Sequence, residues 1–111
     1  MKNPSPPECV VLYRWKLKPG MEEQFIECWS HGTEYLLLQG SFGSRLHKGS
    51  DGLWYGYAQW PNAEAREIAF SNSPETPYRE RMRAAIEESF EPIFLAPVAD
   101  YLCLPQQSEA A

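Results

Sequence analysis

Apolar and polar residues alternate along several short stretches of the chain, and this pattern predicts β-strands. Residues 9–16 are rich in β-branched and aromatic side chains and stop before the turn dipeptide Pro19-Gly20. Their odd positions are all largely apolar, whereas their even positions turn basic after Leu12. We therefore expect a first strand with one wholly buried face and a second face that is covered at one end only.

Two longer stretches follow the period of an α-helix. Over residues 21–39, aromatic, aliphatic or small residues recur at helical spacing, acidic residues cluster near the start and Gly40 follows the end. The second stretch opens with Pro and acidic residues at 61–72, is interrupted by two prolines at 73–77 and resumes over 78–90. The sequence thus predicts one continuous helix and one broken helical segment.

A β-hairpin is expected between these helical segments. Residues 42–48 and 53–60 both contain aromatic residues and alternation, and they flank the turn-forming tetrad at 49–52. The simplest register pairs Lys48 with Leu53. It gives one face with the pairs His47–Trp54 and Arg45–Gly56, and an opposite face with the pair Leu46–Tyr55.

A last strand at residues 98–104 completes the order βαββαβ. With right-handed crossovers this order gives an α+β, ferredoxin-like domain, in which a four-stranded antiparallel sheet carries both helical segments on one face. Tyr, Trp and branched residues occupy both faces of the first and third strands, so the other sheet face needs an apolar cover. A second copy of the chain is the simplest cover, and we expect a homodimer.

Composition narrows the class of protein. The chain has 111 residues and a mass of 12.7 kDa, which corresponds to one domain, placed here at residues 9–104 between loose tails at 1–8 and 105–111. A formal net charge of −5 disfavours nucleic acid and anionic membranes as partners. No stretch has the length and apolarity of a membrane span or of a signal peptide, so the expected location is the cytoplasm.

The three cysteines, Cys9, Cys28 and Cys103, show no spacing typical of a metal site and lie in apolar or periodic runs. We interpret them as reduced packing residues. No phosphate-binding glycine loop, carboxylate pair or Ser/His/Asp pattern stands out. Candidate chemistry therefore comes from the histidines, the arginines and an unusually large set of aromatic residues.

Three blocks of the sequence resemble one known family. They are residues 13–23 (YRWKLKPGMEE), 40–48 (GSFGSRLHK) and 57–65 (YAQWPNAEA). In this order, with a tryptophan that ends the third strand before a Pro/Asn-capped helix, they are similar to the antibiotic biosynthesis monooxygenase (ABM) family of the dimeric α/β-barrel superfamily. The resemblance spans about residues 10–104.

The resemblance implies paired sheets that form a barrel across a dimer, with a pocket in each subunit between sheet and helices. Several family members oxygenate aromatic polyketides without metal, flavin or haem, because the deprotonated substrate itself reduces oxygen. Other members cleave haem or act on quinols. The positions used by the haem-degrading branch fall near Tyr13, near Ala69 or Phe70, and at Tyr78 or Arg79, where the branch's own residue types are replaced.

We therefore expect a monooxygenase that oxidises a small hydrophobic aromatic or quinol-type substrate with molecular oxygen and no bound cofactor. The alternative is a non-catalytic dimeric module that binds a small hydrophobic ligand or a protein partner. Oxygen consumption with hydroxyaromatic compounds distinguishes the two functions.

Two polar residues of the hairpin are candidate catalytic groups. His47 is suited to accept a phenolic proton and Arg45 to stabilise a phenolate, although both can instead reach solvent or a partner subunit. Five aromatic residues are candidates for substrate binding and equally for the core: Tyr13, Trp54, Trp60, Phe70 and Tyr78.

Strand alternation links several of these assignments. The predicted register places His47, Arg45, Trp54 and Trp60 on one face, so they line the pocket together or meet the partner together. In the second case Tyr55 and Tyr57 line the pocket instead.

Other charged and titratable residues have simpler interpretations. His31, in the first helix, is expected to be exposed or packed rather than catalytic. The mixed charges at 79–88 indicate a solvated helix face with local ion pairs, from which Arg79 can reach the mouth of a pocket.

Overall fold

A computed structural model describes residues 6–103 of the chain. Its elements in chain order are β1 (Cys9–Leu17), α1 (Glu22–Leu38), β2 (Gly43–Lys48), β3 (Trp54–Trp60), α2 (Ala63–Ser71), α3 (Pro77–Ala85), β4 (Ile86–Ser89) and β5 (Ile93–Leu95). The predicted α+β, ferredoxin-like fold is confirmed, with the second helical segment broken as expected and the last strand divided in two.

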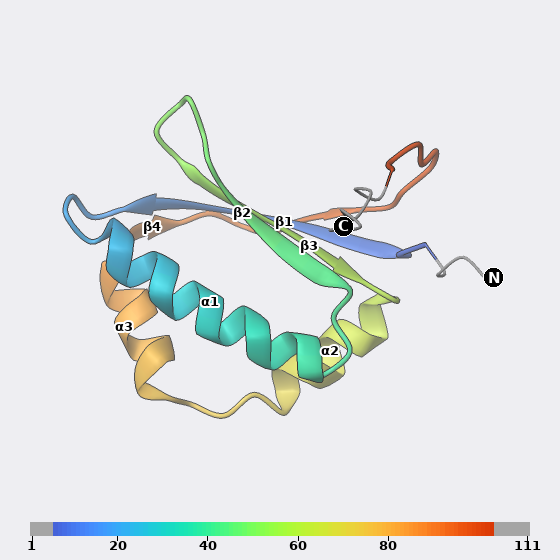
Figure 1. The fold of residues 1–111 in the computed structure, drawn as a ribbon, viewed down its shortest axis with the longest axis horizontal. Helices are drawn as coiled ribbons and strands as arrows, with labels where there is room; N and C mark the ends of the chain where they lie inside the picture. Colours follow the sequence, from blue (N-terminus) through green and yellow to red (C-terminus); the bar gives the residue numbers. More distant parts are fainter. Residues whose placement is uncertain (1–5, 104–111) are drawn as a thin grey trace, which may run out of the picture.

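One antiparallel sheet runs through the molecule in the order β2-β3-β1-β4, and β5 also pairs with β1. Strand β4 pairs with one end of β1 and β5 with the other, so the two short strands occupy the same sheet edge. Between them the Phe90 N–H donates to the Arg14 carbonyl at 3.1 Å, and Pro92, which has no N–H, follows. All three helices lie on one face of this sheet, and we call the opposite side the helix-free face (Figure 1).

The predicted boundaries at the C-terminal end are wrong. The helix expected over 78–90 ends at Ala85, and the edge strand is formed by residues 86–95 rather than by 98–104. Helix α3 ends at Ala85 because the Ala85 carbonyl accepts a hydrogen bond from the Lys18 N–H at 2.9 Å. This bond fixes the end of α3 next to the end of β1. Residues 98–103 are exposed and form no strand, and position 104 lies outside the described residues.

The hairpin register also differs from the prediction, by one residue. Lys48 pairs with Trp54 rather than with Leu53. The loop closes when the Gly49 N–H donates to the Leu53 carbonyl at 2.7 Å, and Gly52 has a φ of +89° that favours glycine. The Asp51 carboxylate accepts the Leu53 N–H at 3.0 Å and so stabilises this longer loop.

A shift of one residue moves every side chain of a strand to the other face. Arg45 now pairs with Tyr57 and His47 with Tyr55. These four side chains share the helix-free face, while Trp54, Gly56, Ala58 and Trp60 face the helices. The prediction that His47, Arg45, Trp54 and Trp60 lie on one face is therefore wrong.

The core lies between the sheet and the helices, in two clusters of buried residues. The cluster near α2 consists of Cys9, Val11, Ala58, Trp60 and Ala69. The cluster between α1 and α3 consists of Trp15, Leu17, Phe25 and Ala85. Cys9 and Cys28 are buried, as expected for packing residues, whereas Cys103 is exposed, so the packing role expected for Cys103 is wrong.

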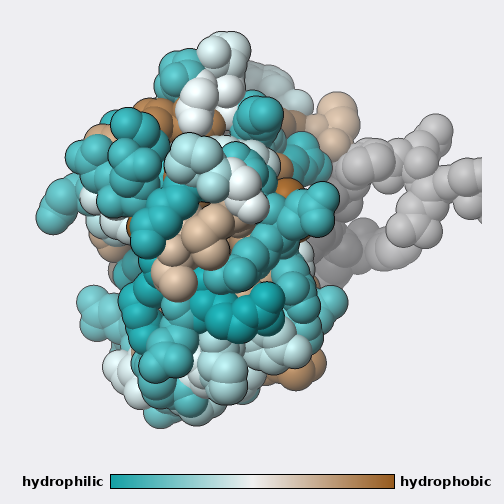
Figure 2. Space-filling model, turned by 90° about the vertical axis from the view of Figure 1, so that its left-hand side faces the viewer, coloured by the Kyte–Doolittle hydropathy of each residue, from teal (hydrophilic) through white to brown (hydrophobic). Residues whose placement is uncertain are grey.

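The outer surface differs between the two ends of the molecule. The end at which α1 begins, on the left of Figure 1, is mostly hydrophilic (Figure 2). Exposed apolar side chains gather instead at β5 and beyond it, at Ile93, Phe94, Leu95, Val98, Tyr101 and Leu102. None of the helices formed by residues 6–103 is long and apolar enough to cross a membrane.

Candidate active site

A cavity of about 490 Å³ opens between the sheet and the helices. Its walls come from β1 and β4, from the inner face of α1, from the linker 72–76 between α2 and α3, and from α3 itself. A volume of this size is typical of sites for small organic ligands. The side chains that decide its chemistry are Tyr13, Trp15, His31, Phe70, Tyr78 and Arg79.

Stacked aromatic rings form the sheet side of the cavity. Tyr13 and Trp15, two residues apart on β1, have ring centroids 5.8 Å apart and planes within 8°. Phe25 of α1 packs against the Trp15 ring in T-shaped geometry, with ring centroids 5.0 Å apart. This geometry gives a rigid aromatic wall against which a planar ligand can pack.

Two glycines near this surface are expected to respond in opposite ways to alanine. A Cβ at Gly56 would lie 2.9 Å from the Trp15 ring, and that ring is held by Phe25, so Gly56→Ala should destabilise the fold by about 1–3 kcal/mol. A Cβ at Gly32 in α1 would meet open space, so Gly32→Ala should stabilise it by about 0.5–1 kcal/mol. Urea unfolding of both variants measures the difference; equal effects would contradict the packing.

Tyr13 is held by an arginine from α2. The Arg66 guanidinium donates to the Tyr13 hydroxyl from Nε at 3.1 Å and from Nη2 at 2.8 Å. The same guanidinium lies 4.6 Å from the Phe70 ring centroid and 4.9 Å from that of Phe94. Arg66 therefore sits in an aromatic enclosure behind Tyr13, and the Tyr13 hydroxyl oxygen accepts both of its hydrogen bonds.

Burial raises the pKa of Tyr13 above its ordinary value of 10.0, while the hydrogen bonds from Arg66 lower it by a smaller amount. The phenol is therefore neutral near pH 7 and acts as a hydrogen-bond donor. A charged guanidinium that donates to its oxygen strengthens this donor. Tyr13 is suited to stabilise a negatively charged oxygen on a ligand.

The raised pKa of Tyr13 predicts a pH-dependent stability. Below pH 10.0 the phenol is neutral in both the folded and the unfolded chain, and its bonds with Arg66 stabilise the fold by about 1 kcal/mol. Above that pH the unfolded chain releases the proton first, so this contribution is lost. The stability difference between wild type and Tyr13→Phe should therefore shrink above about pH 10; urea unfolding as a function of pH would contradict this if the difference stays constant.

His31 of α1 forms part of the opposite wall. Its ring stacks on Tyr78 of α3, with centroids 3.8 Å apart and planes within 19°. Cys28 lines the cavity one turn earlier, and burial raises the pKa of its thiol, which disfavours the nucleophilic thiolate. The titratable base that faces the cavity from this helix is therefore His31.

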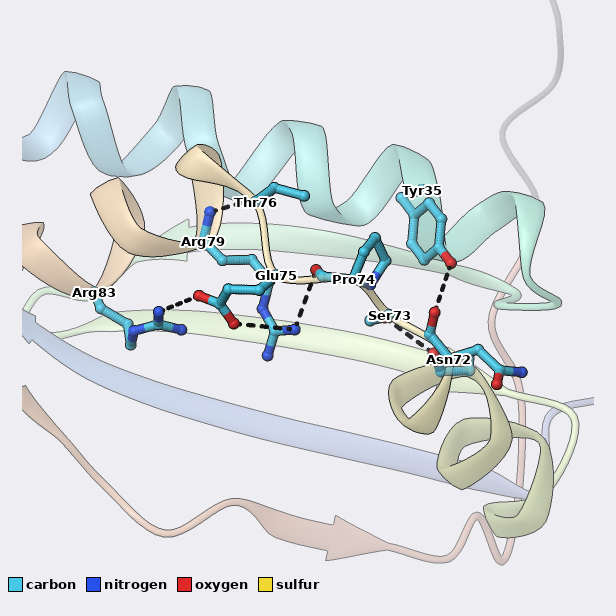
Figure 3. Close-up of polar contacts among 9 residues, drawn as sticks. Tyr35, Asn72, Ser73, Pro74, Glu75, Thr76, Arg79 and Arg83 are labelled. Carbon is cyan, nitrogen blue, oxygen red and sulfur yellow. Dashed lines mark hydrogen bonds and ion pairs between the residues drawn. The ribbon is translucent and has the colours of Figure 1, made fainter.

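The linker between α2 and α3 is tied down at both ends (Figure 3). The Tyr35 hydroxyl of α1 donates to the Asn72 carbonyl at 3.2 Å, and the Ser73 hydroxyl donates to the Ala69 carbonyl at 2.9 Å. Thr76 caps α3 by accepting the Arg79 N–H at 3.2 Å. These bonds hold the linker as a wall of the cavity.

Several solved structures have the same architecture. SnoaB, a cofactor-independent oxygenase from Streptomyces nogalater, is 17% identical, with a TM-score of 0.72 over 86% of this chain and 97% of that chain. A candidate antibiotic biosynthesis monooxygenase from Chloroflexus aurantiacus is 14% identical, with a TM-score of 0.65 over 84% and 95%. Rv0793 from Mycobacterium tuberculosis is 15% identical, with a TM-score of 0.68 over 88% and 100%.

The chain has the fold of the antibiotic biosynthesis monooxygenases. By sequence, it matches no family profile and no curated protein. The resemblance identified from three sequence blocks is thus supported by structure over most of the chain. At these identities the likeness establishes the shared ABM fold.

The structure places the predicted site residues in three locations. Tyr13, Phe70 and Tyr78 line the cavity together. Trp54 and Trp60 face the helices but belong to the core, where Trp60 is only 1% exposed. His47 and Arg45 lie on the helix-free face, away from the cavity.

Two residues at this site were not predicted as site residues. His31 was expected to be exposed or packed rather than catalytic; it is exposed, and it lines the cavity together with Cys28 and Tyr35 of the same helix. Arg66 gave no signal, because its partner Tyr13 is 53 residues away. Among residues 6–103, no cluster of three His, Cys, Asp or Glu side chains is arranged to hold a metal ion.

Proposed function

We propose that the protein is a monooxygenase that oxidises a small hydrophobic aromatic or quinol-type substrate with molecular oxygen and no bound cofactor. The aromatic cavity between sheet and helices carries this proposal, because it combines stacked rings with a polar pair, Tyr13 and Arg66. The shared fold with SnoaB, a cofactor-independent oxygenase, adds support.

The reaction needs no external reductant if the substrate supplies the electrons. For a hydroxyarene, loss of the phenolic proton gives an electron-rich phenolate that reduces O2. One oxygen atom then replaces a ring hydrogen and becomes a quinone carbonyl. The second oxygen atom leaves as water with that ring hydrogen and the phenolic proton, so atoms and electrons balance.

The side chains around the cavity supply three contributions to this chemistry. The rings of Tyr13 and Trp15 hold the flat substrate and exclude water. The Tyr13 phenol, polarised by Arg66, stabilises the phenolate oxygen. His31 accepts the phenolic proton as general base.

The catalytic roles predicted for His47 and Arg45 stay predictions. On the helix-free face they lie where a second subunit would pack, so the geometry favours an interface role for them. The apolar end of that face, with the half-buried Leu12 and the exposed Leu95, is the surface we propose for homodimer formation. Sedimentation equilibrium should give twice the 12.7 kDa chain mass, and a stable monomer at micromolar concentration would reject the dimer.

Oxygen uptake tests the proposed function directly. The purified protein, dialysed against a chelator, is added to a panel of hydroxyaromatics and quinols in an oxygen electrode, with boiled protein as control. Uptake of one O2 per substrate molecule supports the oxygenase. Binding of several panel members without uptake would reject it and support the non-catalytic binding module.

A further inference from the structure

The charge that lines the cavity is opposite in sign to the charge of the chain. The chain carries fifteen Asp and Glu residues against ten Lys and Arg. Nevertheless, no carboxylate of residues 6–103 lines the cavity, whereas Arg79 and Arg83 of α3 both do. A cavity with this lining attracts an anionic group although the protein as a whole is acidic.

One carboxylate beside the cavity is shared by these two arginines. Glu75 lies between them in the linker, where it accepts a hydrogen bond from Arg83 and has an oxygen 3.9 Å from Nη1 of Arg79 (Figure 3). The bond from Arg83 lowers the pKa of Glu75, so this residue is ionised near pH 7. Two guanidinium charges therefore face one carboxylate charge, and one positive charge remains.

Arg79 has unused hydrogen-bonding capacity, and Arg83 is the arginine that donates to Glu75. Among the described residues its guanidinium makes one hydrogen bond, from Nη1 to the Pro74 carbonyl at 3.4 Å. A guanidinium has five N–H donors and binds carboxylates with two of them at once. Arg79 can therefore bind an anionic group without breaking the bond between Arg83 and Glu75.

We infer that the substrate is an aromatic acid, a planar apolar ring system with a carboxylate that binds Arg79. The rings stack on Tyr13 and Trp15, and the carboxylate lies at the α3 side of the cavity. This inference rests on the proposed function in taking the cavity as the substrate site. It adds a requirement for an anionic substituent, which the stacked rings alone do not impose.

Calorimetric titration with 1-naphthoate and 1-naphthamide tests the inference, because these probes share their shape and differ in charge. The wild type should bind naphthoate about tenfold more tightly, the effect of one charge-assisted hydrogen bond in a partly exposed site. Arg79→Gln should abolish this preference and leave naphthamide affinity within about twofold. Added salt should weaken naphthoate binding only.

Two further variants complete the test, one as a matched control and one with an expected gain in affinity. Arg81→Gln removes the same charge from the same helix, but Arg81 pairs with Glu27 and does not line the cavity, so the naphthoate preference should persist. Glu75→Gln removes the competing carboxylate and should raise naphthoate affinity further. All three positions are exposed, so the variants are expected to fold.

Three results would overturn the inference. These are equal affinities of the wild type for the two probes, no detectable binding of either probe, or equal losses in Arg79→Gln and Arg81→Gln. The titration requires no turnover, so it separates this inference from the oxygenase. Charge-selective binding without oxygen uptake would reject only the proposed function, and oxygen uptake with no preference for acids would reject only the inference.

Discussion

Replacement of His31 by alanine is expected to lower the rate of oxygen uptake about a hundredfold or more, the usual contribution of one general base. The chain has only two histidines, and His47 lies on the helix-free face, so His47→Ala provides a matched control. Uptake by the two variants at saturating substrate measures the effect. His31→Gln, which fills similar space but is not a base, should behave like the alanine variant.

The reverse outcome has an equally clear meaning. If His47→Ala loses activity while His31→Ala keeps it, the role predicted for His47 from sequence is supported, and the base acts from the helix-free face. If both variants keep full turnover, neither imidazole accepts the proton. In either case the assignment of His31 is wrong.

The largest loss of stability is expected from Phe25→Ala. Phe25 is fully buried and packs in T-shaped geometry against Trp15 and Trp54, with ring centroids 5.0 Å and 6.2 Å away. Loss of a buried phenyl ring costs about 3–5 kcal/mol, because the cavity that it leaves cannot collapse fully. This is a large part of the total stability of a small domain.

The neighbouring residue gives a control for Phe25. Ile26 follows it on α1 but is 40% exposed, so Ile26→Ala should change the free energy of unfolding by less than about 1 kcal/mol. Chemical denaturation measures both variants. A loss under 2 kcal/mol for Phe25→Ala would contradict the rigid aromatic packing beneath the cavity, since even a well-accommodated ring deletion costs about 3 kcal/mol.

Most of the fold was predictable because local signals and tertiary structure agree. The first strand, the first helix and the cap of α2 by Asn62, which accepts the Ala65 N–H at 2.8 Å, follow from residue type and spacing. The edge strand was not predictable from such signals. Residues 86–89 carry charged side chains typical of a solvated helix, and only pairing with β1 makes them a strand.

The candidate site was harder to predict than the fold, because one residue of register decides which side chains enter it. The prediction pairs Lys48 with Leu53, but in the structure the Gly49 N–H donates to the Leu53 carbonyl and Lys48 pairs with Trp54. This change of register moves His47 and Arg45 out of reach of the cavity. The sequence position of Leu46 could have indicated the correct register of the hairpin. It is the one aliphatic residue of β2, and burial of its side chain requires the observed register.

Contacts between residues far apart in sequence were beyond prediction. The pairing of Tyr13 with Arg66 and the stacking of His31 on Tyr78 depend on how α1, α2 and α3 pack against the sheet. Tyr13, Phe70 and Tyr78 were recognisable as candidates because aromatic residues suit both cores and ligand sites. Residue type alone does not tell these two environments apart.

The central claim is that oxygen chemistry takes place in the cavity between the sheet and the helices. Oxygen uptake by Gly32→Phe tests it most directly, because Gly32 lines the cavity and a side chain built there meets open space. The variant should be as stable as the wild type but consume no oxygen with a substrate that the wild type oxidises, whereas Gly32→Ala should remain active. Full activity of a folded Gly32→Phe variant would show that the reaction takes place elsewhere.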